Sequence, residues 1–157
     1  DEALPFFPAE AESINPWTPV CDELNQYGLK ITGLKPGKYE IRLSGAKIAN
    51  CTAEELASGV NLTKPALAAG PVAEQVNAVW NAVKAKNQFY HDRVFRGIVL
   101  ANVSIPDFLG LNLSAAEIES KRQSAMAERM AKMSELDAAV RQALAPRSHQ
   151  VVVSPAN

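Results

Sequence analysis

The segment 24–62 constrains the fold of this chain more than any other part of it. Two runs in which apolar and polar residues alternate, 29–34 and 38–44, lie on either side of Pro36 and Gly37. Alternation with a period of two is typical of half-buried strands, and Pro-Gly favours a type I or II turn. We therefore expect a β-hairpin across this turn. The residues of the second run that face the core are predicted to be Tyr39, Ile41 and Leu43.

The residues after the hairpin predict a third strand and a short helix. Residues 44–47 have turn composition and precede a short apolar run at 48–51. Thr52 and Glu55 have the spacing of a capping box, in which each side chain bonds the backbone N–H of the other. Gly59 is a natural residue to follow the end of that helix, because glycine adopts the left-handed conformation without strain.

Two longer helices follow in the sequence. The first begins at Pro71, since proline suits the first helical position, and extends to about residue 96. The second begins at Ser114, in a capping box with Glu117, and ends at about residue 145 before Pro146. Apolar residues recur in each at steps of three or four, which predicts one packed face. These residues are Val72, Val76, Val79, Trp80, Val83 and Tyr90, then Ile118, Met126, Met130, Met133, Leu136, Val140 and Leu144.

These elements predict an α+β fold: a small antiparallel β-hairpin or meander unit followed by two long helices that form an antiparallel pair. Three parts are expected along the chain: an extended arm rich in proline and aromatic residues at 1–23, a small β unit with a short helix at 24–62, and a helical region with a C-terminal tail at 63–157. The tail has an apolar run at 149–153, which we interpret as an added edge strand.

Charge and hydropathy give no reason to expect a nucleic-acid partner or a membrane span. The net charge is −1, which gives no electrostatic reason to expect nucleic acid. No apolar run reaches the 18 or so residues that span a bilayer. The chain begins at Asp1 without an initiator methionine or a signal peptide, and we therefore expect it to begin after a cut.

The two cysteines, Cys21 and Cys51, lie at opposite ends of the hairpin region. They either form a disulfide or are two independent buried thiols, and the sequence is compatible with both. A disulfide would favour an extracytoplasmic location, secreted or periplasmic.

The sequence contains no complete set of catalytic, cofactor-binding or metal-ligating residues. Its two histidines are His91 and His149, and no Gly-x-Ser-x-Gly elbow, glycine-rich phosphate loop or short metal-ligand spacing is present. His91 precedes Asp92, but consecutive side chains on a helix point in different directions. We assign no catalytic residue, cofactor or metal from the residues alone.

The block 24–62 resembles the C-terminal region of bacterial SGNH/GDSL-type hydrolases, which are lipase- or esterase-like enzymes. The resemblance rests on Leu-Lys-Ile-Thr-Gly-Leu-Lys-Pro-Gly-Lys-Tyr-Glu-Ile at 29–41 and Thr-Ala-Glu-Glu-Leu-Ala-Ser-Gly-Val-Asn-Leu at 52–62. It implies a flavodoxin-like catalytic domain elsewhere, with a serine nucleophile and an Asp-x-x-His pair. None of those motif positions occurs in this chain, so no catalytic residue is carried over.

The leading hypothesis is an accessory portion of such an ester hydrolase, packed on a catalytic domain or chain that precedes Asp1. Whether this chain is itself an enzyme stays open. One alternative is a non-catalytic binding module for carbohydrate or protein, in which Trp17, Tyr27 and Tyr39 would form an exposed aromatic row. Another is a structural subunit of an assembly, which would present a large apolar interface.

Overall fold

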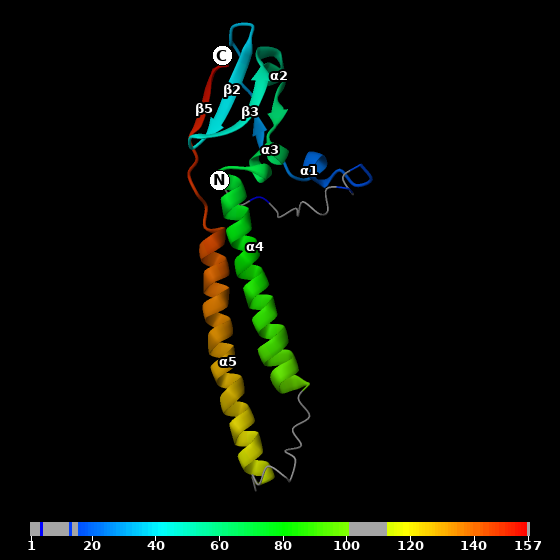
Figure 1. The fold of residues 1–157 in the computed structure, drawn as a ribbon, viewed down its shortest axis with the longest axis vertical. Coiled ribbons are helices and arrows are strands. Elements are labelled where there is room, and N and C mark those ends of the chain that lie inside the picture. The colour runs from blue at the N-terminus through cyan, green and yellow to red at the C-terminus, as the bar shows by residue number, and fades with distance from the viewer. Residues whose placement is uncertain (1–3, 5–12, 14–15, 101–112, 157) are drawn as a thin grey trace. The chain divides into compact units, whose positions relative to one another are not determined.

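The computed structural model describes residues 4, 13, 16–100 and 113–156 (Figure 1). The chain divides into two compact units: unit 1 comprises Asp1–Trp80 and Leu144–Asn157, and unit 2 comprises Asn81–Ala143. The α+β class is confirmed, with short antiparallel strands and long helices. The predicted division at residues 23 and 62 stays a prediction about separately folding parts, and most of the arm at 1–23 lies outside the described residues.

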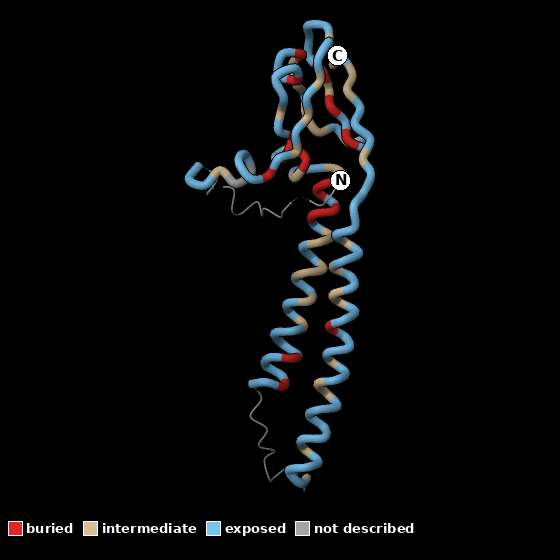
Figure 2. Tube along the Cα trace, turned by 180° about the vertical axis from the view of Figure 1, so that it is seen from behind, coloured by how far each residue is buried: buried red, intermediate tan, exposed pale blue. Residues whose placement is uncertain are grey.

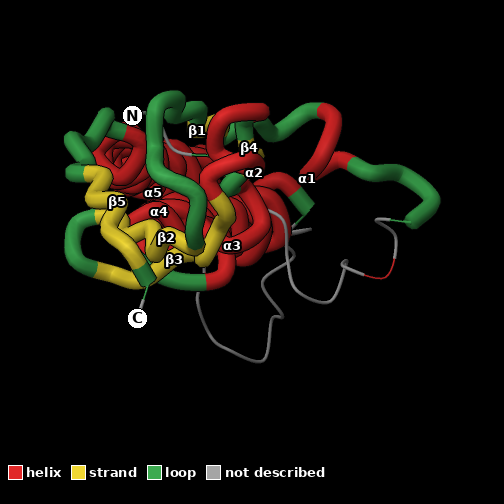
Figure 3. Tube along the Cα trace, turned by 90° about the horizontal axis from the view of Figure 1, so that it is seen from above, coloured by secondary structure: helices red, strands yellow, loops and turns green. Residues whose placement is uncertain are grey.

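Unit 1 contains two small antiparallel sheets. The larger sheet has the order β3 (Ala46–Thr52), β2 (Lys38–Leu43), β5 (Val151–Pro155), as Figure 3 shows from above. The tail therefore does add an edge strand, which pairs with β2 from Leu43 opposite Val151 to Tyr39 opposite Pro155. In the smaller sheet, β1 (Gly28–Leu29) pairs with β4 (Val60–Asn61).

The predicted hairpin across Pro36 and Gly37 is wrong. The first run does not pair with β2; instead β2 pairs with β3 through the turn at Ser44 and Gly45. Both turn residues have positive φ, 47° and 88°. A two-residue turn of this kind matches the twist of the flanking strands, whereas type I and II turns splay them. The Pro36–Gly37 bend instead leads towards α2, because the Gly37 carbonyl accepts a hydrogen bond from the Ala53 amide.

The apolar face of β2 forms the core of unit 1, as predicted. Tyr39, Ile41 and Leu43 are buried, while the residues between them are more exposed (Figure 2). The helix α2 (Ala53–Ser58) adds Leu56, which is 0% exposed. The capping box of Thr52 and Glu55 is confirmed in full, and Gly59 ends the helix with φ 103°.

Two further helices and the start of a third complete unit 1. These are α1 (Val20–Glu23), α3 (Thr63–Ala68) and the first turns of α4 (Pro71–Phe89). Val72 and Val76 of α4 share a buried cluster with Leu43 of β2. The Gln75 side chain, 1% exposed, donates a 2.9 Å hydrogen bond to the Ala145 carbonyl, which ties the return of the chain to α4.

Unit 2 consists of the end of α4, the π-helix η2 (Tyr90–Val99) and α5 (Ala115–Leu144). The helices are antiparallel, since Lys86 pairs with Asp137 and Arg93 contacts Arg129. The capping box at Ser114 and Glu117 is confirmed. The predicted α-helix to residue 96 continues instead as a π-helix after Phe89, and it reaches Val99. No described helix combines the length and apolar composition that a membrane span requires.

Candidate functional site

The structure brings His91 and Asp92 together at the start of η2. His91 Nδ1 lies 2.9 Å from Asp92 Oδ1, although consecutive residues were expected to point apart. The imidazole also stands against the Phe95 ring, with centroids 6.3 Å apart. Both polar side chains are about half exposed, and no hydroxyl or thiol contacts His91 among the described residues. The pair could orient a proton-accepting imidazole, but the contacts supply it with no nucleophile.

His149 lies in the segment of unit 1 that connects the end of α5 to the start of β5 in the sequence. Burial lowers its pKa, which favours the neutral imidazole. Its Nε2 atom is buried without a hydrogen-bond partner in the described part of the chain. This environment is that of a packed side chain rather than of a proton-transfer group in a cleft.

Cys51 is half-buried on β3 and is a free thiol in this structure. Burial, together with the nearby Glu55 carboxylate, raises the pKa of the thiol and so suppresses its reactive thiolate form. The side chain of Cys21 on α1 is outside the described residues, and a bridge between the two cysteines in the oxidised protein stays a prediction. Over the described ranges, no three His, Cys, Asp or Glu side chains are grouped so as to hold a metal ion.

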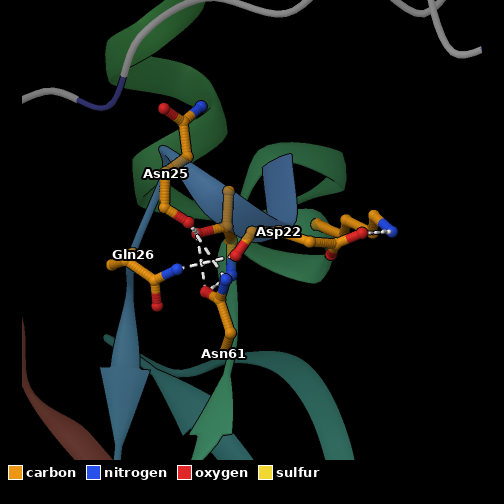
Figure 4. Close-up of polar contacts among 6 residues, drawn as sticks. Asp22, Asn25, Gln26 and Asn61 are labelled. Atoms are coloured by element: carbon orange, nitrogen blue, oxygen red, sulfur yellow. Dashed lines mark hydrogen bonds and ion pairs between the residues drawn. The ribbon is translucent and has the colours of Figure 1, made fainter. Parts of the chain in front are cut away.

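A polar cluster joins residues 22–27 to residues 61–64 (Figure 4). The Asn25 backbone carbonyl accepts a 3.0 Å hydrogen bond from Asn61 Nδ2 and lies 2.8 Å from Thr63 Oγ1. In return, the Tyr27 amide lies 3.1 Å from both Asn61 Oδ1 and Thr63 Oγ1. We call these residues, Asn25, Tyr27, Asn61 and Thr63, the asparagine clasp. It fixes the chain that enters β1 against the chain that leaves β4.

The asparagine clasp was not predicted from the sequence. The available signal was Asn61-x-Thr63, which has the form of a glycosylation sequon but is used here for internal hydrogen bonds. The Asn25 side chain turns away from the clasp, as Figure 4 shows. Its Nδ2 atom is buried and has no partner in the described part of the molecule. At the edge of the clasp, an exposed ion pair joins Asp22 and Lys64 at 2.8 Å.

Large apolar side chains remain exposed in each unit. In unit 1, Trp17 is 88% exposed and Leu24, which directly precedes the clasp, is 75% exposed. The valines of the edge strand β5 are partly exposed as well. The exposed large apolar residues described in unit 2 are Tyr90, Phe95, Val99, Leu100 and Met130. Tyr90 and Met130 belong to the predicted packed stripes, so these stripes pack only in part.

The predicted aromatic row is not formed. Tyr39 is buried, and its hydroxyl donates a 2.9 Å hydrogen bond to the Lys35 carbonyl. Tyr27 is half-buried, and burial raises its pKa. Only Trp17 of the three is freely exposed, so they offer no flat surface on which a sugar ring could stack.

The fold has a counterpart in a known enzyme. A solved structure described as BT4096, a gut microbial diltiazem-metabolizing enzyme, matches 91% of this chain with a TM-score of 0.62 and 19% sequence identity. The match covers 36% of that enzyme's chain, so this chain spans about a third of its length. At this identity the likeness establishes a shared fold and no more. No family model matches the chain, and no curated protein matches it.

Proposed function

We propose that this chain is the accessory portion of an SGNH/GDSL-like ester hydrolase and packs on a catalytic part that precedes it. The observation that carries the proposal is the partial match to an enzyme. The same fold occupies 36% of the chain of the diltiazem-metabolizing enzyme, which leaves the larger part of that chain outside the match. In this proposal, the nucleophile and its base belong to the counterpart of the unmatched portion.

The sequence resemblance supports the same assignment independently. The block 24–62, which resembles the C-terminal region of SGNH/GDSL-type hydrolases, lies entirely within unit 1. Its asparagine clasp holds Leu24 in the solvent-exposed position just described. An exposed tryptophan is the kind of side chain that an interface buries, because tryptophan is enriched among the residues that carry binding energy, and an exposed leucine nearby in the sequence would add apolar area. Trp17 and Leu24 are therefore our candidates for contact with the catalytic part.

The test compares the longer gene product with the same protein from which this chain has been deleted. We expect hydrolysis of short acyl esters by the full protein and a large loss of stability or activity on deletion. Trp17→Ser and Leu24→Ser in the full protein should each reproduce part of that loss. Lys30→Ser, at an exposed position of unit 1 that carries no apolar surface, is the matched control. A deleted protein that is as stable and as active as the full one would refute the accessory role.

A protein-binding module is the second candidate, and the exposure of Trp17 favours it. It differs from the first in its partner, which would be a separate protein rather than a part of the same polypeptide. Fluorescence quenching of the purified full gene product distinguishes the two candidates. If this chain is a module for a separate partner, Trp17 should still be exposed to solvent in the full product. The accessory role predicts that this tryptophan is protected there.

A further inference from the structure

Unit 2 contains a cavity whose lining combines apolar walls with three cationic side chains. The cavity is open to solvent on one side, has a volume of about 210 Å³, and is lined by η2, α5 and Leu113, which precedes α5. Its apolar wall includes Ile98 of η2, which is 4% exposed, together with Ile118 and Ala125 of α5. Lys121, Arg122 and Arg129 of α5 line it as well, and no Asp or Glu is among its lining residues in the described part of the chain.

The cations lie on the face of α5 that packs towards η2. Residues 118, 122, 125 and 129 follow one another at steps of three or four, which places them on one face of the helix, and Lys121 lies at the edge of that face, three positions after 118 and four before 125. The available counter-charges are weak: Arg122 lies 3.7 Å from Glu119, and Lys121 acts on Glu117 only at a distance. Glu117 already accepts hydrogen bonds from Ser114 in the helix cap. Cationic side chains beside an apolar wall favour the binding of an anion that also carries an apolar group, because the charges pair and the apolar surfaces are buried together.

Arg129 is held in place by the backbone of η2. Its Nη1 donates a hydrogen bond to the Arg93 carbonyl, and no other hydrogen bond of this guanidinium occurs among the described residues. Gly97 leaves room for this position of the guanidinium, because a Cβ there would stand 2.9 Å from Nη1 and the end of the arginine side chain would have to shift. A guanidinium has five N–H donors, so a fixed one with a single bond can still bind a carboxylate in a bidentate manner. Glycine and arginine together thus provide a positioned donor at the cavity.

We propose that this cavity binds a small organic carboxylate with an apolar body, of about the size of phenylacetate. A cavity of about 150 Å³ with apolar walls accommodates benzene, so the present one has room for an aryl ring or short alkyl chain and part of a carboxylate. The ring or chain lies against Ile98 and Ile118, and the carboxylate accepts hydrogen bonds from Arg129, with Lys121 and Arg122 adding charge. The inference stands apart from the proposed function, since it concerns binding within unit 2 alone.

The experiment is an NMR titration of the full chain with isotope-labelled isoleucine methyl groups. Phenylacetate should shift the Ile98 and Ile118 methyl signals in a saturable way at millimolar concentration or below. Phenylacetamide, which has the same ring without the charge, should bind about tenfold more weakly or worse, as should Arg129→Gln. Gly97→Ala keeps every charge but displaces the guanidinium, and should weaken phenylacetate binding as well. Arg141→Gln removes one charge from the same helix outside the cavity and should leave binding unchanged.

Three outcomes would overturn the proposal. The first is equal binding of phenylacetate and phenylacetamide, and the second is unchanged binding by both Arg129→Gln and Gly97→Ala. The third is equal shifts with acetate, which would show a response to any anion rather than a site for an apolar body. If Arg129→Gln fails to fold by circular dichroism, Lys121→Gln with Arg122→Gln provides the same comparison on two exposed side chains.

Discussion

Among the residues that the structure describes, unit 1 and unit 2 bury apolar side chains to very different extents. Of the thirteen buried apolar residues that the structure describes, ten lie in unit 1 and three in unit 2. The three are Val94, Ile98 and Met133. Unit 1 uses alternating strand residues, two helix faces and the asparagine clasp, whereas unit 2 is a helical pair with a thin apolar seam and exposed stripes. The stability of unit 1 should therefore depend on single core side chains, whereas substitutions in unit 2, which buries few side chains, should act mainly on the turn of helix where they lie.

The largest expected difference comes from truncation of one buried side chain in each unit. Leu56→Ala in unit 1 should lower the free energy of unfolding by about 2–5 kcal/mol, because its cavity is closed on all sides. Met133→Ala in unit 2 should cost about 2 kcal/mol or less, since water can reach the space that it leaves. Hydrogen exchange resolved along the chain measures both, because it separates opening of the two units. An equal or larger loss of stability for Met133→Ala would contradict the proposed difference between the two units.

The two capping boxes allow a matched test at helix ends. Thr52→Ala and Ser114→Ala each remove a side-chain acceptor and should cost about 1 kcal/mol locally. The first should raise hydrogen exchange throughout unit 1, because α2 carries the buried Leu56. The second should affect only the first turn of α5. Ser134→Ala, which removes a mid-helix hydroxyl bonded to the Met130 carbonyl, is the control and should have little effect.

Loss of exchange protection throughout unit 2 on Ser114→Ala would contradict this account. It would mean that the helical pair unfolds as one unit from its capped end.

The smallest expected effect is a difference in pH dependence between the units. Burial lowers the pKa of His149 in unit 1, so the unfolded chain binds a proton more readily, and stability should fall as pH drops below about 6.5. In unit 2, hydrogen bonds from Ser114 and Lys86 lower the pKa values of Glu117 and Asp137. Their contributions are present above the ordinary carboxyl pKa and should be lost only in more acid solution, below about pH 4.5.

NMR signals of each unit during urea denaturation, at about pH 7.5 and about pH 5.5, measure this difference. Unit 1 should lose stability over this interval while unit 2 changes little. His149→Gln, which cannot be protonated, should remove the loss in unit 1. Retention of the full loss in that variant would show that another group is responsible.

Local sequence signals predicted much of the fold. The alternation in β2, both capping boxes and Gly59 were predicted correctly, because each depends on residues close together in the sequence. The apolar composition of the tail also predicted correctly that it adds an edge strand, although its partner β2 is distant in the sequence. The pairing of the strands was not predicted correctly, since Pro36–Gly37 and Ser44–Gly45 both have turn composition. Which of these two turns joins a hairpin depends on backbone angles and on the partner of β1, which is distant in the sequence.

The asparagine clasp and the lining of the cavity in unit 2 were harder to predict because they join residues that are distant in the sequence. Asn25 and Asn61 are 36 positions apart, and only the fold places the amide of one on the carbonyl of the other. Likewise, the cations of α5 were assigned no site by the sequence, because nothing in it places Gly97 opposite Arg129. The pairing of His91 with Asp92 depends on side-chain rotamers, which spacing alone does not determine.

The central proposal is that this chain is the accessory portion of an ester hydrolase whose reacting groups lie outside it. The most direct measurement is the rate at which the purified 157-residue chain hydrolyses short acyl esters. We predict no saturable turnover above that of buffer, and no change on His91→Ala. Saturable hydrolysis that His91→Ala abolishes would contradict the proposal and place the active site at the start of η2.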